Sequence, residues 1–478
     1  MLKRPNILFV LSDQHSPRFL DFEKQRPINT PSMGRLAREG VFFDNAYCQN
    51  PICVPSRASL ITGRYSRNVG IYDNQDVMQA HCTTFPRVLS AAGYRTCLIG
   101  KSHFNGEQFH GYQQRPYGDF YGQAHQPDPT RTPANGASGL MGWFEYAGST
   151  QIPLPLTQTE ICVAETVKWL QGHVGLHAQQ PFCLSVHFDK PHFPINPPLE
   201  YYRKYEGRMR PDAVSAGHLE RAVPFVRKTI AGFESELCLP LTQELHAKAL
   251  AAYSGCVEWV DNALGRVLEV LDYLELSQNT IVIYTSDHGE MASEHGTWQK
   301  TLFFEASARV PLLIRWPGQA LAGKRDSQLT GLIDLFPTFC AAAGTDLPES
   351  CDGINLMPAL QGERLARNEI FSESVRLKAP GDAGCMLRRD TWKYCYYLDG
   401  AEELYDLASD PGEWKNLAEE ACHRELVREM NQRVVEFWKP EEQRERYDKC
   451  PRMSREKHFY PYSNQFITGD GTVIDARP

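Results

Sequence analysis

The stretch TIVIYTSDHGE, residues 280–290, decides the fold. Its first part is a short run rich in apolar and β-branched residues, and Asp287 and His288 follow at once. Such a run is typical of a strand buried on both faces of a parallel sheet. Polar residues that follow such a strand lie at the carboxyl edge of the sheet, where open α/β sheets bind ligands. The stretch therefore predicts an α/β fold with a site at one sheet edge.

Similar runs recur along the chain and alternate with helical patterns. The expected strands are residues 5–12, 41–46, 94–99, 182–188 and 280–286. The clearest helical patterns cover residues 30–40, which open on Thr-Pro and end at Gly, and residues 242–274. Strands that alternate with helices predict a large, mostly parallel central sheet with helices on both faces.

The pattern changes after about residue 365. Short runs at residues 370–375, 385–388 and 392–398 are typical of antiparallel strands. We therefore expect three units, which are a large α/β domain over residues 1–365, a smaller α+β subdomain with a short antiparallel sheet over residues 366–440, and a tail over residues 441–478. The charged and aromatic tail favours contact with the body or with a second subunit, so a homo-oligomer is one expectation.

Composition narrows the class of protein. The chain has 478 residues, of which 42% are hydrophobic and 23% charged, and a formal net charge of -8. This balance provides no basic field for nucleic acid or an anionic membrane, and no run reaches the roughly 18 apolar residues of a membrane helix. The N-terminal MLKRPNILFVLSDQ favours a buried strand over a signal peptide, which predicts a cytoplasmic protein. The 14 cysteines include no C-x-x-C pair, which favours free thiols.

Residues suited to metal binding follow two of the predicted strands. Asp13 ends the first strand and Gln14 comes next, whereas Asp287 and His288 end the fifth. Oxygen and imidazole donors of this kind suit calcium, manganese or magnesium. Each acid also has a simpler explanation, because Asp13 could cap a turn and Asp287 could cap a helix that starts at Gly289.

Cys53 stands where a short helix is predicted to begin. Pro55 fits the first turn of this helix, and Gly63 ends it. A side chain at the helix start faces free backbone N–H groups and the positive end of the dipole, which favours an anion or a thiolate. Arg57 adds a fixed cation one turn later. Taken alone, a cysteine is more often a small core residue.

Further basic residues follow other elements. Lys101 and His103 come just past the third strand and suit an anionic substrate and proton transfer. His192 follows the fourth strand, and Lys300 follows Trp298. Taken alone, each of these residues could be a surface residue or a helix cap. If they only filled the core, however, they would not all be expected at the ends of predicted strands and helices.

The stretch CVPSRASLITGRY, residues 53–65, resembles the C-x-P-S-R signature of type I sulfatases, with the trailing T-G-R intact. Other blocks are similar to the same family in the same order: PNILFVLSDQ, NTPSMGRLAREGVFFDNAY, GKSHF, TSDHGE, FFEASARVPLLIRWPG, LIDLFPTFCAAAG, DGINLMPAL and ELYDLASDPGEWKNL. The resemblance covers residues 4–420 and implies an alkaline phosphatase-like fold. It also implies a sulfuric ester hydrolase that converts a sulfate monoester to an alcohol and inorganic sulfate.

In that family the signature cysteine is oxidised by a formylglycine-generating enzyme to formylglycine (3-oxoalanine), whose hydrate is the nucleophile. The resemblance implies one divalent metal, calcium first and manganese or magnesium next. It implies these roles: Cys53 as nucleophile; Asp13, Gln14, Cys53, Asp287 and His288 around the metal; Arg57, Lys101 and Lys300 on developing charge; His192 as acid for the leaving alcohol; and His103 as base for the second hydroxyl of the hydrate.

Two positions depart from a pattern that many sulfatases share. The pair Asp13-Gln14 stands in place of two aspartates, and Asp287-His288 stands in place of Asp-Asn. Both pairs resemble those of choline-sulfatases and phosphonate monoester hydrolases. In that subgroup Asn74 matches a polar position near the substrate, although a turn residue explains it equally well.

Alternatives therefore stay open beside a sulfatase acting on a small-molecule or saccharide sulfate ester. One is a phosphonate monoester or phosphodiester hydrolase with the same nucleophile, and another is a non-catalytic metal-binding protein that keeps Cys53 as a thiol. A choline-type substrate would need an aromatic cage for its cation, and the same rings could stack on a sugar. The residues available for such a cage are Tyr117, Phe120, Tyr121, Trp143 and Tyr146.

Overall fold

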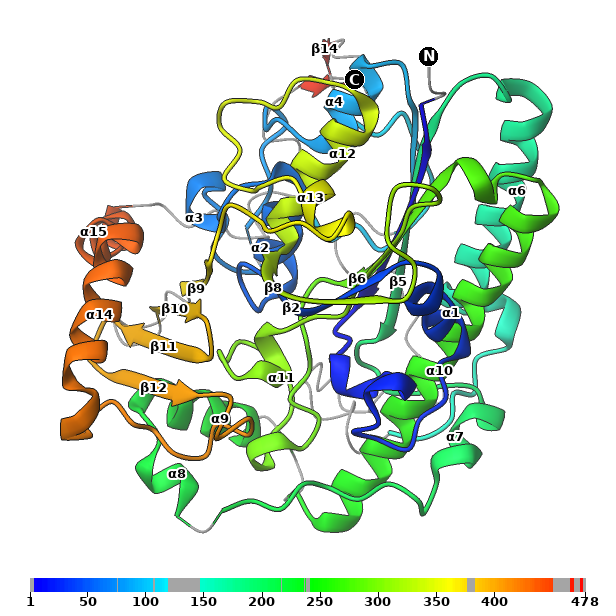
Figure 1. Ribbon diagram of the computed structural model, residues 1–478. Coiled ribbons are helices and arrows are strands. Elements are labelled where there is room, and N and C mark those ends of the chain that lie inside the picture. Colours follow the sequence, from blue (N-terminus) through cyan, green and yellow to red (C-terminus); the bar gives the residue numbers. More distant parts are fainter. Residues whose placement is uncertain are drawn as a thin grey trace.

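The described residues form three sheets, of eight, four and two strands (Figure 1). This computed structural model describes residues 4–74, 76–105, 108–118, 147–215, 217–235, 237, 241–375, 383–449, 465–467 and 473–475. The strands of the large sheet, in spatial order, are β4 (Gln114–Tyr117), β3 (Arg95–Gly100), β5 (Phe182–Pro191), β1 (Asn6–Asp13), β6 (Thr280–Ser286), β7 (Leu312–Arg315), β2 (Val41–Tyr47) and β8 (Lys324–Gly331).

The four-stranded antiparallel sheet lies in the C-terminal region. Its strands, in spatial order, are β12 (Glu402–Asp406), β11 (Trp392–Tyr397), β10 (Ala383–Arg389) and β9 (Glu369–Val375). A separate two-stranded ladder joins β13 (Gln465–Ile467) to β14 (Val473–Asp475).

Helices fill the segments between the strands. The α-helices are α1 (Pro31–Glu39), α2 (Cys53–Thr62), α3 (Ser66–Val69), α4 (Phe85–Ala91), α6 (Gln158–His177), α7 (Leu199–Tyr205), α8 (His218–Arg221), α9 (Pro224–Ser235), α10 (Gln243–Tyr273), α11 (Glu305–Ala308), α12 (Leu335–Ala343), α13 (Met357–Leu360), α14 (Arg424–Trp438) and α15 (Pro440–Lys449). The 3-10 turns are η1 (Pro17–Phe19), η2 (Asp21–Glu23), η3 (Leu154–Leu156), η4 (Ser277–Asn279), η5 (Glu294–Gly296), η6 (Leu332–Asp334) and η8 (Ala421–His423).

The predicted α/β class is confirmed, and each of the five predicted strands of the large sheet is present. Among the described strands of this sheet, only β7 runs antiparallel to its neighbours β6 and β2. Strands β4, β7 and β8 were not predicted. β4 and β8 are the two edge strands and carry exposed polar residues, whereas β7 is a run of only four residues, so none gives a strong periodic signal.

The large sheet is covered on both faces. Ile7 and Phe9 of β1 pack into a core with α2, α4 and α12, whereas Leu8 and Val10 pack on the other face with α1, α6 and α10. Figure 1 shows these two groups of helices on opposite sides of the strands. Burial on both faces explains why β1 is apolar along nearly its whole length.

The register of the central strands brings the predicted site residues to one edge. Ser12 of β1 pairs with Ser286 of β6, so the next residues, Asp13 and Asp287, lie on neighbouring strands at the same level. Asp13 itself pairs with Pro191 at the end of β5. Since β3 lies beside β5, the ends of four adjacent parallel strands converge there.

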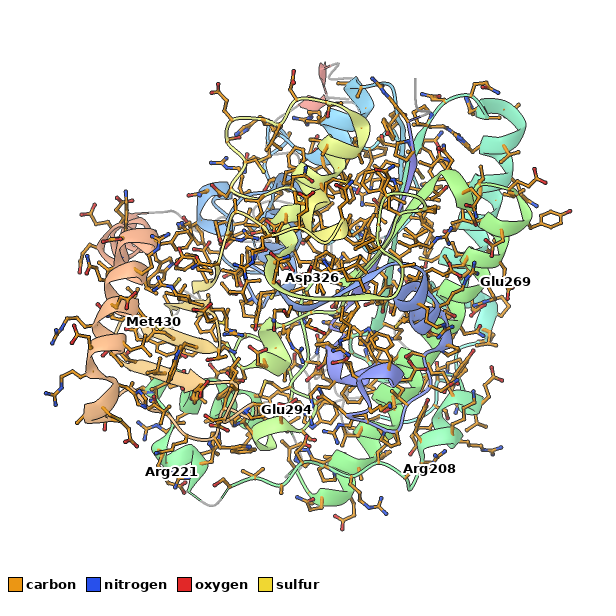
Figure 2. All side chains as sticks on the ribbon, in the orientation of Figure 1. Arg208, Arg221, Glu269, Glu294, Asp326 and Met430 are labelled. Carbon is orange, nitrogen blue, oxygen red and sulfur yellow. The ribbon has the colours of Figure 1, made fainter. Side chains whose placement is uncertain are left out.

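The C-terminal sheet has its own apolar cover. Helix α14 packs on it, and Met430, labelled in Figure 2, is fully buried in the cluster between helix and sheet. Glu373 of β9 ties this sheet to the body, because it pairs with Arg67 at 2.8 Å and accepts a hydrogen bond from the Ser66 hydroxyl at 2.9 Å. The antiparallel strands predicted here are confirmed, and β12 adds a fourth.

Gly63 ends α2, the helix that starts at Cys53, and we expect alanine there to destabilise the protein. Its φ is +65°, and an added Cβ would lie 2.7 Å from Cys351 Sγ. The left-handed backbone costs about 1–2 kcal/mol for a non-glycine residue, and forced packing costs a further 1–3 kcal/mol or so. Gly70 is the matched control, because its φ is +79° but no atom lies within 4 Å of the added Cβ. Denaturant unfolding should show a larger loss for Gly63→Ala than for Gly70→Ala, and equal losses would contradict this packing argument.

Candidate active site

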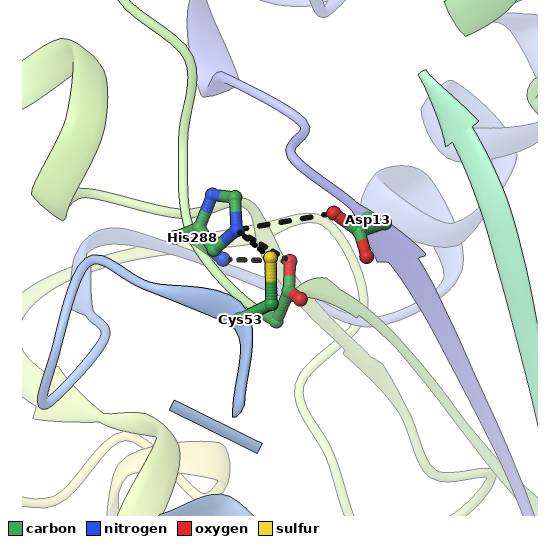
Figure 3. Close-up of side chains that lie close together, drawn as sticks. Asp13, Cys53 and His288 are labelled. Atoms are coloured by element: carbon green, nitrogen blue, oxygen red, sulfur yellow. Dashed lines mark hydrogen bonds and ion pairs between the residues drawn. The ribbon is translucent and has the colours of Figure 1, made fainter. Parts of the chain in front are cut away.

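Ligand atoms from three segments gather at the carboxyl edge of the large sheet. Asp13, Cys53, Asp287 and His288 each contribute one candidate ligand atom, and these atoms all lie within 4.8 Å of one another. Figure 3 shows Asp13 at the end of its strand, Cys53 on its own segment and His288 turned toward both. All four residues are buried. The convergence predicted from the sequence is therefore present in the fold.

Arg57 and Lys101 balance the two carboxylates. Arg57 donates from Nε to Asp287 Oδ2 at 2.7 Å and from a terminal nitrogen to Asp13 Oδ2 at 3.0 Å. Lys101 Nζ lies 2.7 Å from the same Asp13 oxygen. Burial by itself raises the pKa of Asp13, but Lys101, His192, Arg57 and Lys300 hold it well below its usual range. Asp13 is therefore a carboxylate at neutral pH, and Arg57 orients both acids.

The donor set fits a divalent metal. His288 Nδ1 donates to the Gly289 carbonyl at 2.9 Å, so Nε2 faces Cys53 and the carboxylates. This orientation, with one ring nitrogen fixed by a carbonyl, is typical of metal-ligating histidines. Among the described residues, Asp13 Oδ1 has no hydrogen-bond partner, and burying such an atom is costly unless another group compensates. A cation among these atoms would compensate it.

Cys53 lies in a positive environment at the start of α2. Lys300 Nζ lies 3.0 Å from its sulfur, His288 Nε2 3.2 Å and Asn74 Nδ2 3.9 Å. Although burial raises the pKa of the thiol, Lys300 and His288 lower it, and the result lies below the ordinary value. Position 53 thus combines complete burial with several groups that stabilise negative charge.

The source of this positive environment differs from the prediction. The first-turn amides were expected to be free, but the Val54 N–H donates to Asn74 Oδ1 at 3.0 Å. Pro55 has no N–H. The prediction of free amides was therefore wrong for Val54, and Lys300 and His288 lower the pKa of the Cys53 thiol. The simpler explanation of Asp287, as the cap of a helix that starts at Gly289, does not hold, because residues 289–292 are non-helical.

Gln14 and Lys300 meet beside the sulfur. Gln14 has a φ of +68°, and its backbone N–H donates to Asp287 Oδ1 at 3.1 Å. Its side-chain oxygen accepts from Lys300 Nζ at 2.6 Å, and its amide nitrogen donates to Glu290. Sequence reasoning assigned Glu290 no part, although it lies two residues beyond His288 in the same quoted stretch. A carboxylate so close to predicted ligands was the signal that could have identified it.

The two remaining histidines lie within electrostatic reach of the cluster. Burial lowers the pKa of His103 well below its usual range, and Lys101 lowers it further. Burial and the same lysine also lower the pKa of His192, whereas the Asp13 carboxylate raises it. His192 Nδ1 donates to the Phe193 carbonyl at 2.8 Å, which orients the imidazole ring.

Of the five residues suggested for an aromatic cage around a quaternary cation, the structure describes only Tyr117. Phe120, Tyr121, Trp143 and Tyr146 lie outside the described residues. Tyr117 ends β4 at the edge of the large sheet. In the part of the chain that the structure describes, the cysteines are free, and no helix is long and apolar enough to cross a membrane.

The chain matches two family models. The model described as Sulfatase matches residues 5–345, and the model described as N-sulphoglucosamine sulphohydrolase, C-terminal, matches residues 293–440. These matches include each of the residues that form the site.

Relatives and solved structures agree with these matches. The choline-sulfatase of Rhizobium meliloti (strain 1021) is 30% identical over 441 residues, which cover 87% of this chain and 83% of the relative. The phosphonate monoester hydrolase of Agrobacterium radiobacter has a similar structure, with a TM-score of 0.77, 22% identity and coverage of 99% and 100% of the two chains. A protein solved with its substrate D-glucosamine-2-N,6-O-disulfate gives a TM-score of 0.74 at 22% identity, with coverage of 94% and 100%.

The chain belongs to the sulfatase family, type I within the alkaline phosphatase superfamily, and is a sulfuric ester hydrolase.

Proposed function

We propose that the protein hydrolyses a sulfate monoester with formylglycine made from Cys53 and with one divalent metal, calcium before manganese or magnesium. The observation that carries this proposal is the position of Cys53 Sγ, which lies among Asp13, Asp287, His288 and Lys300 in one buried cluster. A core cysteine would not need four ionisable neighbours. We also propose that residues 1–365, 366–440 and 441–478 are the domain, subdomain and tail of the chain.

The metal would be held by Asp13, Gln14, Asp287, His288 and residue 53, and when bound it would withdraw charge from sulfate oxygens. Formylglycine would provide a geminal diol, one hydroxyl for attack on sulfur and one for release of sulfate. Both groups fit a site whose carboxylates and buried thiol are already oriented by Arg57 and Lys300.

The chain's own residues would then perform distinct tasks. Lys101 and Lys300 place ammonium groups beside Asp13 and Cys53, where they stabilise negative charge that grows in the transition state. A bound sulfate anion would raise the pKa of His192, so that Nε2 can protonate the leaving oxygen. His103, kept neutral by burial and by Lys101, is suited to accept the proton of the second hydroxyl.

The substrate class is a small-molecule or saccharide sulfate ester. The relative named a choline-sulfatase supports a small-molecule ester, and the structure solved with a glucosamine disulfate supports a saccharide ester. Asn74 is proposed to bind the substrate, because its amide nitrogen lies 3.9 Å from Cys53 Sγ at the rim of the cluster. We propose a formylglycine-generating enzyme as the partner that modifies Cys53.

A phosphonate monoester hydrolase is the second candidate, favoured by the Asp13-Gln14 and Asp287-His288 pairs and by the similarity to the Agrobacterium enzyme. Purified protein should be tested on 4-nitrophenyl sulfate and on a 4-nitrophenyl phosphonate monoester with the same leaving group. A higher kcat/KM for the sulfate supports the proposal. A higher kcat/KM for the phosphonate replaces it with the second candidate.

Replacement of His192 by alanine is expected to depend on the leaving group. General acid catalysis contributes typically 10²–10⁴-fold, so hydrolysis of an alkyl sulfate should fall by about that factor. Hydrolysis of 4-nitrophenyl sulfate should fall much less, because nitrophenolate leaves without a proton. His173→Ala is the matched control, because His173 is buried but stacks on Trp169 in α6. Equal losses for both esters would show that His192 is not the acid.

A further inference from the structure

We infer that Glu290 is a positioning residue that fixes the side-chain amide of Gln14, so that the amide oxygen faces Lys300 and the metal-binding cluster. This inference rests on the proposed function, because it concerns the same site. It assigns a task to a buried carboxylate whose hydrogen bonds with described residues go to Gln14, Ala292 and Gln299.

Glu290 is completely buried and accepts hydrogen bonds from three groups. One carboxylate oxygen, Oε1, accepts from the backbone N–H of Gln299 at 2.6 Å and from that of Ala292 at 3.1 Å. The other, Oε2, accepts from Gln14 Nε2. Burial raises the pKa of Glu290 more than these donors and the charge of Lys300 lower it, so that the pKa is about 7.

The contact with Gln14 fixes which way the amide points. A side-chain amide has an oxygen that only accepts and a nitrogen that only donates. Because Glu290 accepts from the nitrogen, the oxygen must face the other way, where it lies 2.6 Å from Lys300 Nζ. Lys300 Nζ in turn lies 3.0 Å from Cys53 Sγ. If the amide were reversed, its nitrogen would face the ammonium, and no oxygen would be offered to a metal.

Glu290 also completes the charge balance around the site. Asp13, Asp287 and Glu290 are the acids of this cluster, and Arg57, Lys101 and Lys300 are its cations. The pair Asp13-Gln14 carries one carboxylate, and Glu290 places another directly behind Gln14. The second carboxyl group thus lies one side chain further from the metal position than it would on residue 14.

The Glu290→Gln variant tests the orientation of the Gln14 amide separately from the packing of residue 290. Its Oε1 can still accept from the backbone of Ala292 and Gln299, which preserves the loop that leads to Lys300. Its amide nitrogen, however, would meet the nitrogen of Gln14, and two donors in contact would turn the Gln14 amide around. Glu290→Gln therefore changes the direction of the Gln14 amide and not the local backbone hydrogen bonds.

A double-mutant cycle with calcium alone as ligand tests this inference. We expect Glu290→Gln to raise the calcium Kd, measured by titration calorimetry, by about 10–100-fold, as for other residues that orient a metal ligand. In a Gln14→Ala background the same change should have little further effect, because the amide it acts through is gone. If Glu290 acted only through its charge, the loss would be as large in that background, and the inference would be overturned.

A donor–acceptor exchange provides the second variant if Glu290→Gln does not fold. In the Gln14→Glu/Glu290→Gln protein the hydrogen bond is retained with its direction reversed, the total charge is unchanged, and an oxygen again faces Lys300. Calcium binding within about threefold of wild type supports the inference, and binding as weak as that of Gln14→Ala overturns it. A wild-type protein that binds no calcium, manganese or magnesium instead overturns the metal in the proposed function, and this is seen before any variant is compared.

Discussion

Replacement of Cys53 by alanine is expected to lower kcat/KM for 4-nitrophenyl sulfate by on the order of 10⁵ or more, because the variant keeps the charges of the site but has no nucleophile. Steady-state assays with the purified variant measure this loss. The matched control is Cys48→Ala. Cys48 is equally buried on the same segment, but burial raises the pKa of its thiol. We expect this control to keep most of its activity.

The proposed conversion of Cys53 to formylglycine can also be tested directly. Mass spectrometry of the peptide that carries residue 53, from protein produced together with a formylglycine-generating enzyme, should show an aldehyde in place of the thiol. Protein that is fully active with an unmodified thiol would contradict the formylglycine proposal. Protein with an unmodified thiol and no activity, from its native host, would favour the non-catalytic alternative.

Replacement of Asp13 by asparagine is expected to weaken metal binding by roughly a thousandfold. One unit charge about 4 Å from another interacts by about 4 kcal/mol at an effective dielectric constant of 20, and the asparagine removes that charge. Activity should fall in parallel, because the metal contributes to charge stabilisation. Calorimetric titration with calcium, manganese and magnesium measures the affinity, and the metal that binds most tightly identifies the preferred ion.

Two controls accompany the Asp13 variant. Asp261→Asn also removes a buried carboxylate, but the two oxygens of Asp261 accept from the backbone N–H groups of Ser32 and Met33 at the start of α1, and the asparagine oxygen can replace one of these acceptors. It should retain metal affinity. Removal of one partner from a buried ion pair costs about 3–5 kcal/mol, so the free energy of unfolding of each variant is measured as the second control.

Wild type treated with a chelator should also lose activity and regain it with added cation, and undiminished activity after chelation would contradict the metal proposal.

Much of the fold was predictable because it depends on local patterns. Buried strands such as β1 and β6 consist of apolar runs that end abruptly in polar residues, and this signal needs no knowledge of neighbours. The edge strands were missed for the opposite reason. β8 has exposed polar residues along much of its length, so its pairing with β2 is a consequence of tertiary structure.

The candidate site also combines features that local sequence patterns predict with features that depend on the tertiary structure. The sequence predicted that Asp13 and Asp287 would follow strands, but only the order β3-β5-β1-β6 makes their strands neighbours. Cys53 comes from the segment after β2, which β7 separates from β6, and it reaches the site through its own loop. That loop is fixed by the Thr301 N–H, which donates to the Pro51 carbonyl at 2.9 Å.

By itself the sequence determined the residue types of the candidate site, the mostly parallel character of the sheet and the edge at which the candidate site lies, because these follow from patterns within short segments. The tertiary structure decided which groups touch. In the folded protein the Val54 N–H donates to Asn74, Lys300 Nζ lies beside Cys53 Sγ, and Glu290 accepts from the Gln14 amide. Hydrogen bonds between residues far apart in the chain depend on the paths of several loops at once, and no local pattern specifies those paths.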